Sequence, residues 1–404
     1  MIIHETQKFK TTIISVRFKE ALSKENLGYR ALLPQLLKAG TDKLSRKEIK
    51  EQLEDLYGAN LNVRTFKLGL TSIVQFELRI INPTFTDEPI FTDALSFLHN
   101  IIYDHKSFKK NDFDIEKRVL LEKINSFKND KTSYAIYRLF EEMFKEDVYK
   151  LRTDGTVETV EGITLNGLYK YYQTMINEND IDVLLSGHIT EDMRKQVSKV
   201  FMPRKQQELS IIDRNTLLDR DFKAVEELDH ISQAKLNIGY RLPILYDDER
   251  RPAAVVFNTI LGGSAQSRLF INVREKHSLC YYIGSQYDPF KGIMFIYSGI
   301  DLNRVDLALK VIKEQLEDLT KNITDHELNL AKAVLINQLK EQEDSQTRMM
   351  SFLYQKELLG LKDRDINKAI DELLSVTKEQ VLEIAKMVRE DTRFILRPEA
   401  NHGA

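Results

Sequence analysis

The chain has 404 residues, more than one hydrophobic core usually accommodates, so two domains of about 200 residues are expected. Its 59 basic and 62 acidic residues are spread along the chain and give a net charge of −3, without the basic block that predicts a nucleic-acid partner. Cys280 is the single cysteine, the first residues lack the pattern of a secretory signal, and no apolar run is long enough for a membrane span, so we expect a cytoplasmic protein.

The two halves of the chain show the same order of elements, which predicts two equivalent domains. Each half begins with a strand pattern, a polar turn and an apolar helix that ends at a glycine. In the first half these are residues 11–18, 23–26 and 29–38, ending at Gly40; in the second half they are residues 235–240, 247–250 and 253–261, ending at Gly262.

Both halves continue with alternating apolar residues around a glycine turn, which predicts a β-hairpin in each. The hairpins span residues 56–80 and 279–300, with Tyr57 and Tyr281 at equivalent positions. Long helical patterns follow at residues 113–127 and 324–343, and short strands close the halves at residues 181–185 and 393–396. Three pairs have the spacing of a capping box at a helix start, namely Ser45 with Glu48, Thr324 with Glu327, and Thr377 with Gln380.

The segment 202–220 is polar, contains Pro203 and lacks a sustained period, which is typical of a linker. We therefore predict a first repeat domain at residues 1–205, a linker at 206–220 and a second repeat domain at 221–404. Strands, hairpins and helices in each half favour an α+β fold, in which a mostly antiparallel sheet packs against helices in both domains.

The segment from Leu261 to Tyr281, LGGSAQSRLFINVREKHSLCY, carries the most specific pattern in the chain. Gly262 and Gly263 end an apolar helix, an amphipathic stretch follows, and Arg274 lies seven residues before Tyr281. This block resembles the carboxy-terminal half-domain motif of the pitrilysin and mitochondrial-processing-peptidase family of inverted zincins. The resemblance implies a two-domain half-shell in which Arg274 and Tyr281 hold a substrate peptide.

Active inverted zincins carry H-x-x-E-H on a helix of the first domain, where two histidines bind zinc and the glutamate activates water. When residues 38–41 are set on the family's F-K-G-T, these positions become Ala31, Pro34 and Gln35. Alanine has no donor atom, proline has no side-chain base, and a glutamine carbonyl is a poor ligand for zinc. The resemblance therefore implies a degenerate metal site.

The third zinc ligand of the family is a glutamate on a later helix, and its register here gives Lys123, with Glu122 one residue earlier. One hypothesis is that the Lys123 ammonium pairs with Glu116 or Glu122 and partly replaces the charge of zinc. The alternative is a solvated charge on a helix face.

Other hydrolytic sites have little support in the sequence. The eight histidines include no pair three or four residues apart, and no G-x-S-x-G elbow occurs. Cys280 lies in an apolar hairpin, where a small buried thiol is usual.

Each residue of the resemblance also has a structural alternative. An arginine such as Arg274 is commonly a surface charge, and a tyrosine such as Tyr281 commonly packs half-buried. Gly262 and Gly263 match the place of the glycine-rich loop in the non-catalytic subunit of mitochondrial processing peptidase, but a helix C-cap explains them equally well. An exposed sheet edge is a further route for binding an extended peptide.

The resemblance implies a catalytically inactive, substrate-binding subunit of a heterodimeric zinc metallopeptidase. A homologous partner with H-x-x-E-H would supply the zinc and the general base, and we expect no metal and no activity in this chain alone. The alternative is a structural or peptide-binding subunit with no proteolytic partner; a metalloenzyme with atypical ligands is a third possibility.

Overall fold

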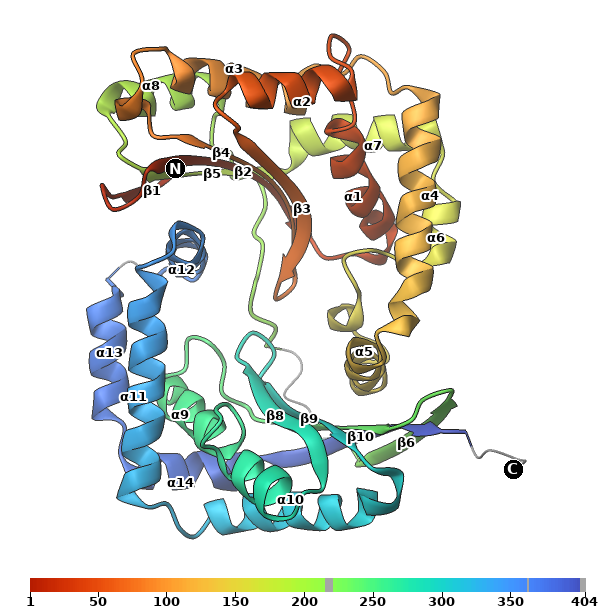
Figure 1. Ribbon diagram of the computed structural model, residues 1–404, viewed down its shortest axis with the longest axis vertical. Helices are drawn as coiled ribbons and strands as arrows, with labels where there is room; N and C mark the ends of the chain where they lie inside the picture. The colour runs from red at the N-terminus through yellow and green to blue at the C-terminus, as the bar shows by residue number, and fades with distance from the viewer. Residues whose placement is uncertain (215–220, 362, 400–404) are drawn as a thin grey trace. The chain divides into compact units, whose positions relative to one another are not determined.

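The computed structural model describes residues 1–214, 221–361 and 363–399, which form two compact units (Figure 1). Unit 1 contains Met1–Ser126, Leu151–Ile211 and a third segment that begins at Gln342. Unit 2 contains Phe127–Lys150, Ile212–Glu341 and a third segment that begins at Asp363. Each unit is thus assembled from both halves of the sequence.

Unit 1 is built on a five-stranded sheet in the order β1-β5-β2-β4-β3. The strands are β1 (Ile2–Glu5), β2 (Thr11–Ala21), β3 (Asn60–Leu68), β4 (Thr71–Ile81) and β5 (Asp180–Gly187). All neighbours pair antiparallel except β1 and β5, which are parallel. β2 is buried on both faces, because Ile14 and Val16 join the main core while Ile13 faces a second apolar cluster.

Helices cover both faces of the unit 1 sheet. The helices contributed by the first half are α1 (Lys24–Leu37), α2 (Arg46–Asp55), α3 (Ile90–Tyr103), α4 (Lys110–Ser126), α6 (Val157–Glu161), α7 (Leu165–Glu178) and α8 (Glu191–Val200). The second cluster is completed by Met350 and Tyr354 of α12 (Gln346–Leu358), a helix from the second half of the chain. Figure 1 shows α12 across the sheet from α2 and α3.

Unit 2 repeats this plan with a five-stranded sheet in the order β6-β10-β7-β9-β8. Its strands are β6 (Lys223–Asp229), β7 (Ala234–Arg241), β8 (Cys280–Asp288), β9 (Ile293–Ile300) and β10 (Arg389–Pro398). β6 runs parallel to β10, and the other pairs are antiparallel. The edges of this sheet are β6 and β8.

One face of the unit 2 sheet packs on helices from the second half, and the other packs on a helix from the first half. The second-half helices are α9 (Arg251–Leu261), a π-helix (Leu269–Lys276), α10 (Val305–Leu319), α11 (Asp325–Gln342), α13 (Ile366–Ser375) and α14 (Lys378–Met387). On the opposite face lies α5 (Lys131–Met143), where Phe140 contacts Phe295 edge-on with ring centroids 5.1 Å apart. Short 3-10 turns complete the chain at Pro83–Phe85, Phe127–Asn129, Val148–Lys150 and Leu302–Arg304.

The predicted fold class is confirmed: both units are mostly antiparallel sheets packed against helices, and both predicted hairpins form. The three predicted capping boxes are present as hydrogen bonds at Ser45, Thr324 and Thr377. The polar turn expected at residues 23–26 is instead the first turn of α1, because Ser23 caps the helix and its hydroxyl accepts from the Asn26 N–H.

The domain limits 1–205 and 221–404 stay a prediction, and residues 215–220 of the expected linker lie outside the described part of the chain. Within that part, no helix combines the length and apolar character that a membrane crossing requires.

Candidate functional site

The degenerate metal-site positions lie on α1. Ala31 and Pro34 are buried in unit 1 and Gln35 is half-buried, with Pro34 inside the helix. α1 packs against α4, so the two helices that carry zinc ligands in the active family are neighbours here too. Their side chains do not fit zinc, and the described residues contain no group of three or more His, Cys, Asp or Glu that could hold a metal ion.

Lys123 has a different partner from those hypothesised. Its ammonium lies 2.7 Å from Asp154, while Glu116 binds Arg46 at 2.7 Å. The hypothesis of a Lys123 pair with Glu116 or Glu122 is therefore wrong. The Lys123 side chain is 64% exposed, because it projects from α4 toward the loop before α6.

Asp154 keeps its negative charge in this arrangement. Burial acts to raise the pKa of Asp154, but hydrogen bonds from Lys123 and Arg152 outweigh it and lower the pKa below the ordinary value. The pair is a charge contact between α4 and the loop before α6.

A buried arginine beside these positions was not predicted. Arg30, fully buried on α1, donates to the Phe18 carbonyl at 2.7 Å and to the Ser72 hydroxyl at 2.8 Å, and lies 3.2 Å from Glu20. It also donates to the Asn179 side chain and the Tyr171 hydroxyl. The guanidinium thus joins α1 to β2, β4 and α7. The signal in the sequence was a single charge inside the apolar run YRALLPQLL.

Arg274 projects from the predicted amphipathic helix, which is a π-helix in the structure. Leu269 and Val273 are buried in the core of unit 2, whereas Arg274 is exposed and its guanidinium lies 4.6 Å from the centre of the Phe270 ring. Among the residues that the structure describes, Arg274 has no ion pair or hydrogen-bonded side-chain partner.

Arg268 of the same segment provides a contrast. It is nine-tenths buried, donates to Glu327 and to the Asn322 carbonyl, and forms a second ion pair with Asp318. Its donors are used within unit 2, so its role is structural, whereas the Arg274 guanidinium is exposed and stacks on Phe270.

Tyr281 is exposed because of a bulge at the start of β8. Cys280 pairs with Ile300 and Tyr282 pairs with Gly299, which leaves Tyr281 without an opposite residue. Its side chain is 72% exposed, while Cys280 is buried as predicted.

The bulge and Arg274 lie close together. The Leu279 N–H donates to the Val273 carbonyl at 3.0 Å, which joins the end of the π-helix to the start of β8. Burial raises the pKa of the Cys280 thiol, and a hydrogen bond with Ser298 and the positive charge of Arg274 oppose this rise. Arg274 and Tyr281 therefore occupy adjoining ends of two elements of unit 2.

Gly262 and Gly263 end α9, and both N–H groups donate to the Asn258 carbonyl, at 2.9 and 2.8 Å. The Gly262 carbonyl accepts from the Ser285 N–H at 3.0 Å. A Cβ on Gly262 would lie 2.7 Å from that nitrogen, so only glycine allows α9 to approach β8 this closely. The helix C-cap is confirmed, and contact of these glycines with a substrate stays a prediction.

β8 is an edge strand, and the Gly262 carbonyl binds its outer edge at the Ser285 N–H. In an antiparallel strand the N–H and C=O groups of every second residue point to the same edge, so those of Ile283 point to the same edge as those of Ser285. Ile283 lies closer to Tyr281 along the strand. An extended peptide added there would run past Tyr281 and Arg274.

Three comparisons place the chain among known proteins. Residues 162–335 match the domain described as the peptidase M16 inactive domain. The chain is 30% identical to the probable inactive metalloprotease YmfF of Bacillus subtilis, over 98% of this chain and 95% of that protein. It is 26% identical to the uncharacterized zinc protease YmxG of the same bacterium, over 89% of this chain and 85% of that protein.

The fold agrees with these sequences. A crystal structure of a conserved protein from Enterococcus faecalis superimposes with a TM-score of 0.91 and 29% identity, covering 99% of this chain and 96% of that one. The predicted family is confirmed by the matched domain and by the relative that is 30% identical over nearly the whole chain. The chain therefore belongs to the M16 metallopeptidase family, as an inactive homologue within it.

Proposed function

We propose that this chain is the catalytically inactive, substrate-binding subunit of a heterodimeric zinc metallopeptidase. A homologous subunit with H-x-x-E-H would supply the zinc and the general base, while Arg274 and Tyr281 of this chain hold the peptide. The pair acts by positioning, since holding a peptide in a reactive pose raises the rate of a reaction carried out elsewhere.

The observation that carries this proposal is the contrast between Arg268 and Arg274. Unit 2 uses Arg268 for its own stability, but it leaves Arg274 exposed above Phe270 and displays Tyr281 on a bulge. A guanidinium fork and a phenol on a stiff arm suit peptide carbonyls, and the nearby edge of β8 suits an extended backbone.

The relatives support a pair of subunits. One Bacillus strain has both a relative named an inactive metalloprotease and another named a zinc protease. We propose the same division of labour here, with both subunits in the cytoplasm, where the single unpaired Cys280 would stay reduced.

The test mixes this chain with the zinc-bearing homologue from the same genome and measures peptide cleavage. Arg274→Ala is expected to lower kcat/KM by about tenfold or more, because a hydrogen bond from a charged group contributes roughly 1.5–3 kcal/mol. Tyr281→Phe is expected to lower it by about two- to tenfold, because a neutral hydroxyl contributes roughly 0.5–1.5 kcal/mol. Gel filtration of each complex shows whether assembly is intact.

Two matched variants serve as controls. Lys276→Ala removes an exposed charge from the same π-helix, and Tyr57→Phe alters the equivalent tyrosine of the first repeat. Both are expected to leave cleavage unchanged. Full activity of the Arg274 and Tyr281 variants would refute the shared site, and failure of the two proteins to associate would favour a structural or peptide-binding subunit with no proteolytic partner.

A further inference from the structure

The edge strand β6 is anchored differently from the inner strands of the unit 2 sheet. Its side chains alternate between half-buried and exposed, and its only buried residue is Asp229. Leu228 is 59% exposed, so β6 places no fully buried apolar side chain in the core. The inner strands β7 and β9 of the same sheet are buried almost throughout. Apolar packing therefore holds β7 and β9 but does little for β6.

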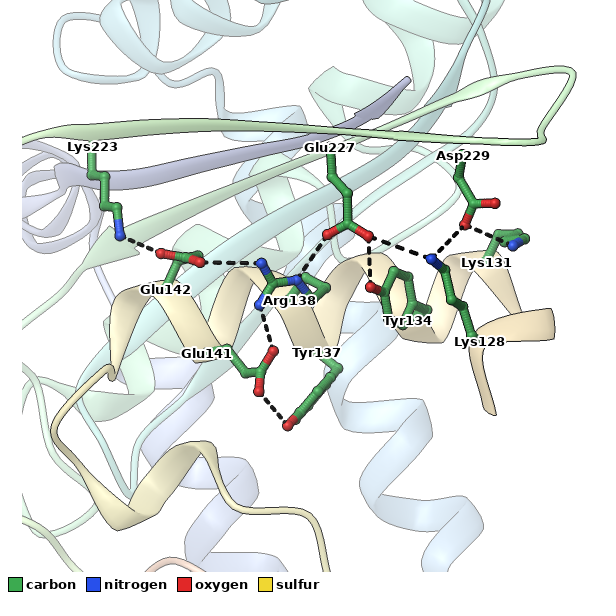
Figure 2. Close-up of polar contacts among 10 residues, drawn as sticks. All are labelled: Lys128, Lys131, Tyr134, Tyr137, Arg138, Glu141, Glu142, Lys223, Glu227 and Asp229. Atoms are coloured by element: carbon green, nitrogen blue, oxygen red, sulfur yellow. Dashed lines mark hydrogen bonds and ion pairs between the residues drawn. The ribbon is translucent and has the colours of Figure 1, made fainter. Parts of the chain in front are cut away.

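Polar contacts from α5 follow one face of β6 instead (Figure 2). We name these contacts the α5–β6 ladder: Lys131 to Asp229 at 2.7 Å, Tyr134 to Glu227 at 2.6 Å, Arg138 to Glu227 at 3.0 Å, and Glu142 to Lys223. The helical positions recur every three or four residues and meet alternate residues of the strand, so both elements present one continuous face.

The charges along the ladder are complementary at both ends. Lys131 and Arg138 face the acidic end of β6, while Glu142 faces Lys223 at its other end. Lys128, just before α5, adds contacts of 3.6 Å to Asp229 and 3.8 Å to Glu227. These side chains are mostly half-buried, so the pairs are stronger than fully exposed ones but still within the reach of salt.

Further groups of α5 contact the ladder, and the Phe394 ring of β10 lies 5.6 Å from the Arg138 guanidinium. Arg138 also binds Glu141 at 2.6 Å and Glu142 at 3.2 Å, and the Tyr137 hydroxyl donates to Glu141. The Arg138 guanidinium thus binds three carboxylates, and its contact with Glu227 is the one that reaches β6.

Two carboxylates of the ladder, Glu142 and Asp229, have lowered pKa values and are ionised at neutral pH. The hydrogen bond from Lys223 lowers the pKa of Glu142. Burial acts to raise the pKa of Asp229, but hydrogen bonds from Lys131 and the His230 N–H lower it further. A lowered carboxyl pKa stabilises the fold above the ordinary value of about 4 and loses this effect as pH falls through the lowered value. Ionic strength is therefore the variable that acts on the ladder at neutral pH.

We propose that β6 is a releasable edge strand, latched to α5 by the α5–β6 ladder, and that loosening the ladder frees β6 from β10 while the inner strands stay folded. Local openings of this kind occur where few apolar contacts hold an element. The edge of β10 becomes accessible whenever β6 leaves it.

Hydrogen exchange of the full chain, followed by mass spectrometry at neutral pH, tests the latch. Raising NaCl from about 0.1 M to about 1 M shortens the screening length from about 10 Å to about 3 Å. Amides of β6 are expected to exchange about tenfold faster or more, while those of β7 and β9 keep their rates.

A pair of neighbouring glutamates gives the matched variants. Glu227→Gln removes the charge that Arg138 and Lys128 face and is expected to speed β6 exchange about tenfold at low salt. Glu226→Gln removes a more exposed charge, which pairs with Arg397 of β10 at 2.9 Å outside the ladder, and is expected to have a clearly smaller effect on β6 exchange.

Two results would overturn the proposal: β6 amides as protected as those of β7 at both salt concentrations, or equal effects of the two glutamine variants. If Glu227→Gln does not fold, the salt series on the unaltered chain decides alone.

Discussion

Arg30 lies directly before Ala31, the first degenerate metal position. Its side chain is part of a buried polar network inside unit 1. Its partners come from three other elements, β2, β4 and α7, and include the buried Glu20. A buried guanidinium is tolerated only when its donors are satisfied, as they are here. The helix that binds zinc in active members is thus anchored here by a guanidinium.

We expect Arg30→Met to lower the free energy of unfolding by about 3 kcal/mol or more, because it leaves Glu20 as an uncompensated buried charge. Urea unfolding followed by circular dichroism measures this loss. Arg118→Met, which alters an exposed arginine of α4, should change stability by less than about 0.5 kcal/mol. Equal losses for the two variants would show that the network contributes little.

Lys123 gives a prediction about pH. The lowered pKa of Asp154 means that its pair with Lys123 stabilises the fold above the ordinary aspartate value of about 3.9, and that this stabilisation disappears as pH falls through the lowered value. Lys123→Met should therefore cost at most about 1 kcal/mol at neutral pH, since the lysine is exposed, and nothing in strong acid. Unfolding curves of both proteins across this pH range measure the difference. A cost that persists below the titration of Asp154 would point to packing rather than charge.

At the scale of elements, substituting Gly262 tests whether this glycine is needed for packing or contacts a substrate. Gly262→Ala should lower stability by about 1–3 kcal/mol, because the new Cβ would press on the Ser285 nitrogen 2.7 Å away. Gly162 ends α6 as Gly262 ends α9, but a Cβ there would meet its nearest atom at 3.6 Å, so Gly162→Ala should be neutral. Thermal unfolding of both variants compares the two C-caps. A fully stable Gly262→Ala protein would contradict the structural role of this glycine and favour its role in a substrate-contacting loop.

The sequence predicted elements better than it predicted their partners. Alternating residues around glycine turns were enough to predict β3 with β4 and β8 with β9, because each hairpin is a local structure. The strand β6, KAVEELD, was missed because it is half charged and its stability depends on α5. The bulge that exposes Tyr281 could not be predicted either, since it depends on the register between β8 and β9.

The same limit applied to the buried and the exposed arginines. The sequence around Arg30, Arg268 and Arg274 is mixed or apolar in each case and does not distinguish their roles. Only tertiary contacts show that Arg30 and Arg268 are structural and that Arg274 is the candidate ligand contact. The resemblance to a family singled out Arg274, and the structure supplies the physical reason that it is the free one.

At the scale of the whole molecule, the two halves exchange one helix each. α5 belongs to the first half in sequence but packs in unit 2, and α12 belongs to the second half but packs in unit 1. The α12 contacts are specific: the Tyr354 hydroxyl donates to Asp182 at 3.0 Å, the Arg17 guanidinium lies 4.1 Å from the centre of the Tyr354 ring, and Gln346 binds Thr11. An amphipathic pattern predicts that such a helix has a buried face, but not which sheet buries it.

This exchange predicts that the halves stay together after the chain is cut between Arg214 and Asp221. A protease site inserted there should yield two fragments that co-elute in gel filtration, since each sheet keeps a helix supplied by the other fragment. Adding Tyr354→Ala and Gln346→Ala should weaken the association, because α12 then loses its hydrogen bonds to unit 1 and much of its buried contact. Glu357→Ala, a change at an exposed position of the same helix, serves as the control. Fragments that separate at once without these substitutions would show that the exchanged helices contribute little to holding the molecule together.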